Sequence, residues 1–412
     1  MLKTDTASEP RLTRSGFGLR PFTGLLIGIS SVTWMGTSIY VPALSIIETE
    51  LGLNASQVGA TLTIYYVCYA LFMPLVGPLS DAWGRRGFLL AGSVLFLLGS
   101  VSCMLAGNVV PVYLGRGLQG IGAGMLQVPI LAMVSDECRG RIMYRILGLL
   151  GALTAIIPAL AMIIGGAVAH FGRWRPIFLF LTLASLLTTA LCLLVLKETL
   201  PEERRGRIAG LLVVLAGYRN MLLSRQMLAV GAPLILSACA LGAFYTTAPF
   251  IVNDTFHLST LYLGVVNILF VLAAAAGQYL SSLSIRRVSS SSVYLFGGMM
   301  ALAGGTAFAV LDYRSAISSL AVISTPLAMF AFSFGFMEPA GLKSILTHFE
   351  NRSGMASALY GSLLLLLQGL GSQVAGILMN IAYPPVTSLA LVMAPVTLLM
   401  AVAALAARDS LR

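Results

Sequence analysis

Two ionisable side chains stand inside long apolar runs of the sequence, and they are the first candidates for chemistry. Glu338 is the one acidic residue, of 15, that falls well inside such a run, and Arg116 lies inside another. An ionisable group in hydrocarbon is costly, so it usually serves a function. Glu338 predicts a carboxyl group that exchanges protons or binds a cation. Arg116 predicts a fixed positive charge that stabilises a pocket or assists proton release.

Each of these residues also has a purely structural interpretation. Glu338 could pair with Lys343 or a polar neighbour, and the Arg116 side chain could extend outward to the membrane surface. Counted along their runs at 1.5 Å per residue, the two residues differ in depth by roughly 16 Å. We therefore expect two separate roles rather than a direct salt bridge.

The composition indicates the elements that must carry these residues. Of 412 residues, 58% are hydrophobic and 10% are charged, against about 45–50% and about 25% in ordinary globular domains. Twelve membrane spans of about 20 residues need roughly 240 apolar positions, close to what this composition supplies. The composition disfavours soluble enzymes, nucleic-acid-binding proteins, disordered chains and outer-membrane barrels. It predicts an all-α integral membrane protein.

Apolar runs of spanning length predict twelve transmembrane helices. They fall at about 21–44, 58–80, 87–107, 110–133, 146–169, 176–197, 227–250, 261–283, 292–311, 316–346, 354–380 and 384–407. The longest connection begins with KETLPEERRGR and continues in a mixed segment, 208–223, that fits an interfacial helix. The predicted organisation is a tail (1–20), a six-helix bundle (21–197), a central loop (198–226), a second six-helix bundle (227–407) and a tail (408–412).

The net charge of +10 is explained by topology. Most lysines and arginines fall in segments on the same side as the two termini, and the loops of the other side hold Arg173, Arg175 and Arg314. This bias predicts that both termini are cytoplasmic and that the chain crosses the cell inner membrane many times. The polar start lacks a cleavage site and predicts an uncleaved tail. We expect a lipid bilayer, and no nucleic acid, as the partner of the basic residues.

Cofactor chemistry is not indicated. The five cysteines are an odd number without CxxC spacing, which argues against a disulfide framework. His170, His257 and His348 lie at predicted helix ends or in loops, so neither a metal cluster nor a histidine proton relay is expected. The sequence has no P-loop motif. We expect no cofactor, no metal and no ATP-driven step.

The turn after the second predicted helix carries a dense motif. It reads Gly77-Pro-Leu-Ser-Asp81-Ala-Trp-Gly84-Arg85-Arg86. Gly77 predicts close helix approach, Gly84 predicts a tight turn, and Asp81 can form charge-assisted bonds with the arginines. A second basic pair, Arg286-Arg287, follows about half a chain length later. This recurrence predicts two six-helix repeats.

These motifs resemble those of the major facilitator superfamily, whose loop signature G-x-L-x-D-x-x-G-R-[RK]-x-x-x-L is matched at every defined position. The stretch that begins Arg116-Gly-Leu-Gln119-Gly120 resembles the R-x-x-Q-G motif of the twelve-helix drug:proton antiporter branch. Ser38-Ile-Tyr40-Val-Pro-Ala-Leu44, with KETLPEERR, resembles the Bcr/CflA type. The resemblance covers nearly the whole chain.

The resemblance implies two pseudo-symmetric bundles that rock about a midplane pocket, in a secondary transporter with no enzymatic activity. Its substrate would be a small amphiphilic drug or metabolite, exported in exchange for protons by a monomer. The motif of Gly77, Asp81, Gly84, Arg85 and Arg86 would form the gate on the cytoplasmic side.

Two departures from the group weaken this expectation of proton-coupled export. Ser38 stands where the group carries an aspartate, and a serine does not exchange protons near neutral pH. In the fifth helix, Ile157, Ala161 and Met162 replace glycines and a proline of the antiporter signature. Facilitated uptake or uniport of a siderophore-like or other metabolite therefore stays open. A polytopic membrane enzyme is disfavoured, because the sequence lacks a His, Asp or Glu constellation at a membrane face.

The resemblance also assigns pocket-lining helices, and aromatic and amide side chains on them suit a moderately lipophilic ligand. For each of these residues, helix packing or an interfacial aromatic belt is the alternative. The pocket candidates are Trp34, Ser38, Tyr40, Tyr65, Tyr69, Gln119, Gln127, Phe244, Tyr245, Asn267, Tyr360 and Gln368.

Overall fold

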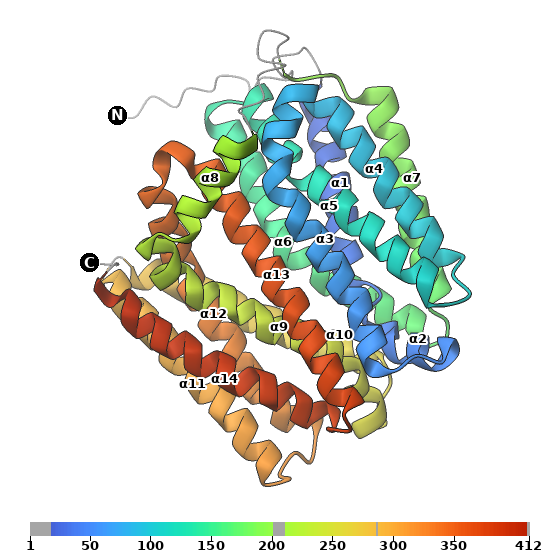
Figure 1. The fold of residues 1–412 in the computed structure, drawn as a ribbon, viewed down its shortest axis with the longest axis vertical. Helices are drawn as coiled ribbons and strands as arrows, with labels where there is room; N and C mark the ends of the chain where they lie inside the picture. Colours follow the sequence, from blue (N-terminus) through green and yellow to red (C-terminus); the bar gives the residue numbers. More distant parts are fainter. Residues whose placement is uncertain (1–17, 201–210, 286, 410–412) are drawn as a thin grey trace, which may run out of the picture.

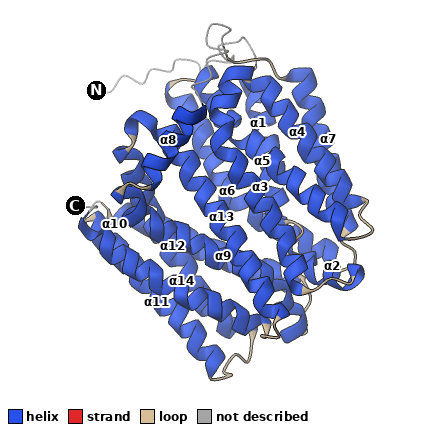
Figure 2. Cartoon of the chain, in the orientation of Figure 1, coloured by secondary structure: helices blue, strands red, loops and turns tan. Residues whose placement is uncertain are grey.

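The computed structural model describes residues 18–200, 211–285 and 287–409, and this part of the chain is helical, without a β-strand element (Figure 2). Twelve helical stretches within it are long and apolar enough to cross a membrane. The predicted fold class is confirmed. Most of the predicted N-terminal tail, part of the central loop, Arg286 of the second basic pair and the last three residues lie outside the described residues.

Seven helices make the first half (Figure 1). They are α1 (Leu19–Ser38), α2 (Leu44–Leu51), α3 (Ala55–Trp83), α4 (Arg85–Met104), α5 (Val109–Glu137), α6 (Gly140–Ala169) and α7 (Arg175–Val195). A short 3₁₀ turn, η1 (Val41–Ala43), joins α1 to α2, so these two helices form one interrupted span.

The connection between the halves contains α8 (Leu211–Leu222), close to the predicted interfacial segment. The second half has α9 (Ala232–Phe250), α10 (Leu261–Ser284), α11 (Ser290–Tyr313), α12 (Leu320–His348), α13 (Ser353–Asn380) and α14 (Pro385–Ala406). Single π-helical turns, η3 (Met227–Gly231) and η4 (Ile251–Thr255), extend α9 at both ends. Short 3₁₀ turns, η5 (Glu350–Arg352) and η6 (Ala407–Asp409), precede α13 and follow α14.

Local sequence explains where several helices begin. Asn54 caps α3 in a reciprocal capping box with Gln57, and Asn108 caps α5, which satisfies N–H groups that lack an intrahelical partner. Pro42 lies in η1, where its missing N–H interrupts the first span. That span reaches Leu51 rather than 44 because α2, an amphipathic helix that includes Glu48 and Glu50, continues it beyond the apolar run.

The helix ends define two ends of the molecule. The terminal end contains the start of α1, the end of α14 and the connection with α8, and the distal end contains the α2–α3 and α13–α14 turns. Between the halves, α3 packs against α13 and α6 packs against α10. In Figure 1, α3 (blue) and α13 (orange-red) run side by side.

Hydrogen bonds between the halves concentrate from the distal end to the middle of the molecule. At the distal end, Asn253 donates to Ser45 Oγ over 2.8 Å and the Thr260 hydroxyl donates to the Gly166 carbonyl over 3.0 Å. Further bonds connect α3 to α13: Gln373 to Ser56, Ser372 to Gly59, Thr63 to Gly369, Gln368 to Tyr66 and Ser362 to Ala70.

Candidate functional site

The Arg116 guanidinium is fully buried inside the first half, where α1, α3 and α5 meet. Its Nη1 donates to the Gly36 carbonyl over 3.0 Å and to Gln119 Oε1 over 2.7 Å. Its Nε donates to the Thr61 carbonyl over 3.4 Å. The remaining nitrogen, Nη2, has no hydrogen-bond partner among the described residues. The side chain does not extend to the membrane surface.

Two tyrosine rings enclose the same guanidinium. Its Cζ atom lies 4.2 Å from the ring centroid of Tyr40 and 4.1 Å from that of Tyr65, within cation–π range. Among the described residues, every group that contacts Arg116 is uncharged. The charge is therefore held by carbonyls, one amide and two ring faces.

Further hydrogen bonds hold the side chains around Arg116 in place. Gln119 Nε2 donates to Ser100 Oγ over 2.9 Å, which leaves its Oε1 facing the guanidinium. The Tyr40 hydroxyl pairs with Thr61 Oγ1 at 3.2 Å. The Tyr65 hydroxyl donates to the Thr33 carbonyl over 3.3 Å.

Glycines bring the backbones around Arg116 into contact. Gly99 and Gly115 face each other across α4 and α5, and Gly92 and Gly122 form a second such pair, so that a Cβ on any of the four would strike the partner helix. Gly120 lies against the Tyr65 carbonyl of α3 in the same way. Small residues allow this approach without lost packing.

Ser38, the residue at the position of the missing aspartate, is buried at the end of α1. Its hydroxyl pairs with Thr37 Oγ1 at 3.0 Å. Within the described part of the chain the polar partner of Ser38 is thus a neighbouring hydroxyl, and it supplies no charge to balance Arg116.

Glu338 lies on α12 in the second half, half-buried. Its Oε2 accepts a hydrogen bond from Gln278 Nε2 of α10 over 2.8 Å. Tyr294 of α11 and Tyr360 of α13 are buried in the same half. The Tyr294 hydroxyl donates to the Val230 carbonyl over 2.9 Å, whereas the buried Tyr360 hydroxyl has no hydrogen-bond partner in the part of the chain that the structure describes. Among the described residues, the group that hydrogen-bonds the Glu338 carboxylate is therefore a neutral amide.

The structure does not bring Glu338 and Arg116 together. Arg116 contacts side chains and carbonyls of the first half, and Glu338 contacts the second half. Gln278 and Tyr294 were not predicted from the sequence. Gln278 lies on α10 and Tyr294 on α11. Tertiary packing decides which side of each helix faces α12, and no local sequence pattern marks these two residues as neighbours of α12.

Four of the pocket candidates have buried polar atoms that find no hydrogen-bond partner within residues 18–200, 211–285 and 287–409. These are Trp34 Nε1, Gln127 Oε1, both amide atoms of Asn267 and the Tyr360 hydroxyl. Buried polar groups are normally paired, so these atoms are available to a bound ligand or to water.

The other candidates make packing contacts. Gln368 donates to the Tyr66 hydroxyl over 3.1 Å, between the halves. Tyr69 contacts Tyr65 edge to face with ring centroids 6.0 Å apart. In the second half, Phe244 contacts Tyr245 and stacks on Phe270, whose role the sequence did not suggest.

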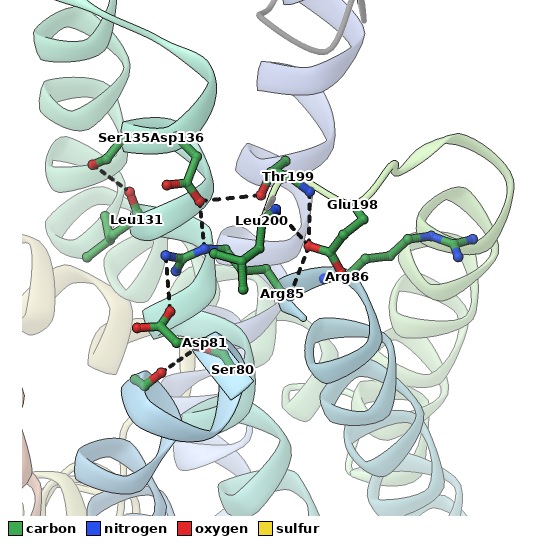
Figure 3. A network of polar contacts seen from close by, with 11 residues as sticks. Ser80, Asp81, Arg85, Arg86, Leu131, Ser135, Asp136, Glu198, Thr199 and Leu200 are labelled. Atoms are coloured by element: carbon green, nitrogen blue, oxygen red, sulfur yellow. Dashed lines mark hydrogen bonds and ion pairs between the residues drawn. The ribbon is translucent and has the colours of Figure 1, made fainter. Parts of the chain in front are cut away.

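The predicted gate motif forms a polar network at the terminal end (Figure 3). Arg85 pairs with Asp81 at 3.1 Å and with Asp136 of α5 at 2.6 Å. Arg86 donates to the carbonyls of Leu196 and Leu193 after and within α7, over 2.7 and 3.1 Å. The motif thus ties the ends of α3, α4, α5 and α7 together.

Glu198 completes this network, although the sequence did not indicate its role. Its carboxylate accepts the backbone N–H groups of Arg85 and Arg86 at the start of α4, over 3.1 and 3.2 Å (Figure 3). It also accepts those of Thr199 and Leu200, each over 3.0 Å. A carboxylate at a helix N-terminus is favourable.

Two glycines of the motif differ in their behaviour. Gly84 has φ +94°, and a Cβ there would run into Glu198, so the predicted tight turn is confirmed. At Gly77 a Cβ would meet no atom within 4 Å. The expected close helix approach at Gly77 is therefore absent, because α3 faces open space there.

Comparison with known proteins gives the family. The sequence pattern of the Major Facilitator Superfamily matches residues 26–372. The chain belongs to the major facilitator superfamily. It is a multi-pass membrane transporter of small molecules and not an enzyme.

Relatives include drug-resistance proteins. The chain is 29% identical over 362 residues to a chloramphenicol resistance protein of Pseudomonas aeruginosa, covering 85% of this chain and 83% of the relative. It is 24% identical to the multidrug resistance protein MdtL of Klebsiella pneumoniae, covering 79% and 81%. The fold is similar to that of a D-xylose–proton symporter, with a TM-score of 0.70 at 15% identity over 93% of this chain and 97% of that chain.

Proposed function

We propose that the protein exports a small amphiphilic drug or metabolite across the cell inner membrane by alternating access, coupled to protons through Glu338. The observation that carries the proposal is the Glu338 carboxyl group, whose hydrogen-bond donor is the neutral Gln278. No cationic group of the described residues pairs with this carboxylate, so it can accept a proton or bind a cationic substrate. The similarity to chloramphenicol and multidrug resistance proteins supports export.

Alternating access is supported by the placement of contacts between the halves. The bonds of Asn253 with Ser45 and of Thr260 with Gly166 close the distal end. The bias of basic residues to the other end supports cytoplasmic termini. Together they favour a state that is closed on the outer side, with the Asp81–Arg85–Asp136 network as the gate element on the inner side. The proposed transporter works as a monomer.

Arg116 has a different part in this proposal. Its buried positive charge, uncompensated by a carboxylate among the described residues, raises the electrostatic potential in the first half. A cationic substrate or a proton is therefore favoured near Glu338 in the second half and disfavoured near Arg116. The two residues would position the charge of the substrate rather than exchange a proton with each other.

A second candidate function is facilitated uptake or uniport of a siderophore-like or other metabolite. Ser38 favours it, since this hydroxyl stands at the end of α1, where the group that the sequence resembles carries an aspartate. In that case Glu338 would bind substrate or stabilise the fold without coupling to protons.

The test is proton movement in proteoliposomes that enclose a pH-sensitive dye. We expect wild type to move protons when a lipophilic cation or chloramphenicol is added under a pH gradient, and Glu338→Gln to lose this signal. Glu350→Gln is the matched control, because Glu350 is an exposed carboxylate in η5, just after α12. Exchange of labelled for unlabelled chloramphenicol, which is uncharged, needs neither net proton release nor a carboxylate partner. Glu338→Gln should therefore retain this exchange, which shows that the variant is folded.

The contrary outcome is equally clear. Transport that is indifferent to the pH gradient and to Glu338→Gln would contradict proton coupling. Accumulation of a siderophore under those conditions would favour the uptake function.

A further inference from the structure

A cavity of about 580 Å³ opens at the distal end of the first half, away from the residues discussed above. It lies where α4 ends and α7 begins, beside α2. Its size is within the range of about 300–1,000 Å³ that small-molecule sites occupy. The cavity is lined by Glu50, Met104, Leu105, Arg173, Trp174, Arg175, Pro176 and Leu179.

The polar wall of the cavity carries one positive charge in excess. Glu50 is engaged twice, by an ion pair with Arg175 and by Trp174 Nε1, which donates to its Oε2 over 2.7 Å. Arg175 also donates to the Ala106 carbonyl over 2.9 Å and lies over the Trp174 ring at 4.4 Å. Arg173 is exposed and pairs with no described residue. An anionic group therefore has a free partner here, whereas an ammonium group does not.

The apolar wall continues into a surface that faces lipid. Leu105 and Leu179 are exposed at the cavity. Leu98, two helical turns before Leu105 on α4, and Leu183, one turn after Leu179 on α7, are exposed as well, each by more than half. In a multi-pass membrane protein, such apolar side chains at helical spacing contact acyl chains. The cavity thus joins a basic group at a helix end to a lipid-facing strip.

We propose that this cavity is a binding site for an anionic phospholipid of the phosphatidylglycerol type. Arg173 and the outer face of Arg175 contact the phosphate diester, and one acyl chain lies along Leu105, Leu98 and Leu183. The combination of a phosphate partner with an acyl-chain surface selects a lipid over a soluble phosphate. Because Glu50 is already paired with Arg175 and Trp174, it offers no free carboxylate to an ammonium group. The site therefore favours an anionic head group.

Trp174 in the cavity wall provides the measurement. In a variant with Trp34→Phe and Trp83→Phe, Trp174 is the remaining tryptophan. Phosphatidylglycerol with brominated acyl chains, added to the full-length protein in detergent micelles, should quench its fluorescence at lower lipid fractions than brominated phosphatidylcholine does. Arg173→Gln should raise the fraction of phosphatidylglycerol needed for quenching about fivefold, as expected for the loss of one interfacial arginine. The variant should then respond to phosphatidylglycerol and phosphatidylcholine at similar lipid fractions.

Two controls make the result decisive. Arg314→Gln removes an exposed arginine at the same end of the molecule, after α11 and away from the cavity, and should leave the lipid preference unchanged. Inorganic phosphate should not displace the brominated lipid. Equal quenching by both lipids in the parent, equal effects of the two arginine variants, or displacement by phosphate would each overturn the proposal.

Discussion

At the scale of the residue, Arg116 shows how a buried charge is tolerated without an opposite charge. Transferring an ion from water to the protein interior costs several kcal/mol even after relaxation. Each neutral hydrogen-bond acceptor or aromatic ring face that contacts the ion offsets part of this free energy. A guanidinium can use the Gly36 carbonyl, the Gln119 amide and two ring faces together because it is planar and forked. A lysine ammonium is a compact point charge and cannot.

We therefore predict that Arg116→Lys lowers the free energy of unfolding by about 1–3 kcal/mol although it preserves the charge. The measurement is thermal unfolding of the purified protein in detergent. Arg314→Lys, at an exposed position, should change stability by less than about 0.5 kcal/mol. Equal melting temperatures for the two variants would show that the planar shape of Arg116 is unimportant.

At the scale of the element, the start of α4 depends on a carboxylate from a distant part of the chain. Glu198 accepts the first two N–H groups of α4, and Gly84 gives it room and supplies the positive φ of the turn. Three residues on, Gly87 lies inside α4 with open space around it. Gly84 and Gly87 thus have opposite requirements: a side chain is excluded at Gly84 and has room at Gly87.

This contrast gives a matched pair of variants. Gly84→Ala should destabilise the turn by about 1–3 kcal/mol, because an alanine is strained at that φ and its Cβ displaces Glu198. Gly87→Ala should stabilise α4 by about 0.5–1 kcal/mol through helix propensity. Hydrogen–deuterium exchange of the segment 85–92 should rise in the first variant and fall in the second. The same exchange in both would contradict the capping role of Glu198.

At the scale of the whole molecule, the two halves are held by bonds at and toward the distal end, and alternating access requires those bonds to break. We predict that Ser45→Cys with Asn253→Cys, joined by a short bifunctional thiol reagent in a background lacking the five native cysteines, stops transport. Cleaving the reagent should restore it. The side chains at these positions already lie 2.8 Å apart.

The control pair lies within one half. Asp312→Cys with Thr387→Cys joins α11 to α14, whose side chains are 3.1 Å apart at the same end. Cross-linking that pair should leave transport intact, since both helices move together. Full transport by the cross-linked Ser45 and Asn253 pair would rule out opening at the distal end.

The sequence predicted the spans and the turn at Gly84 because both depend on local chemistry. Hydropathy reports burial along one helix, and positive φ favours glycine wherever it occurs. The partners of Arg116 and the capping role of Glu198 were missed because they join segments that are far apart in the chain. Gln119, Tyr40 and Tyr65 were predicted to line a pocket, whereas in the structure they contact Arg116. A polar or aromatic side chain predicts that a contact exists, but the sequence does not tell whether the partner is a ligand or another residue. The proposed roles of Glu338 and Arg116 in transport stay predictions.

The paired glycines of α4 and α5 have a consequence for anyone who wishes to evolve this protein toward new cargo. Their backbones touch at Gly92, Gly99, Gly115 and Gly122, so any larger residue there forces the two helices apart and moves Arg116 with them. A mutational library gains nothing at these four positions. Diversity is better placed where side chains border unpaired polar atoms, around Trp34, Gln127, Asn267 and Tyr360, because there a new side chain changes recognition without moving the scaffold.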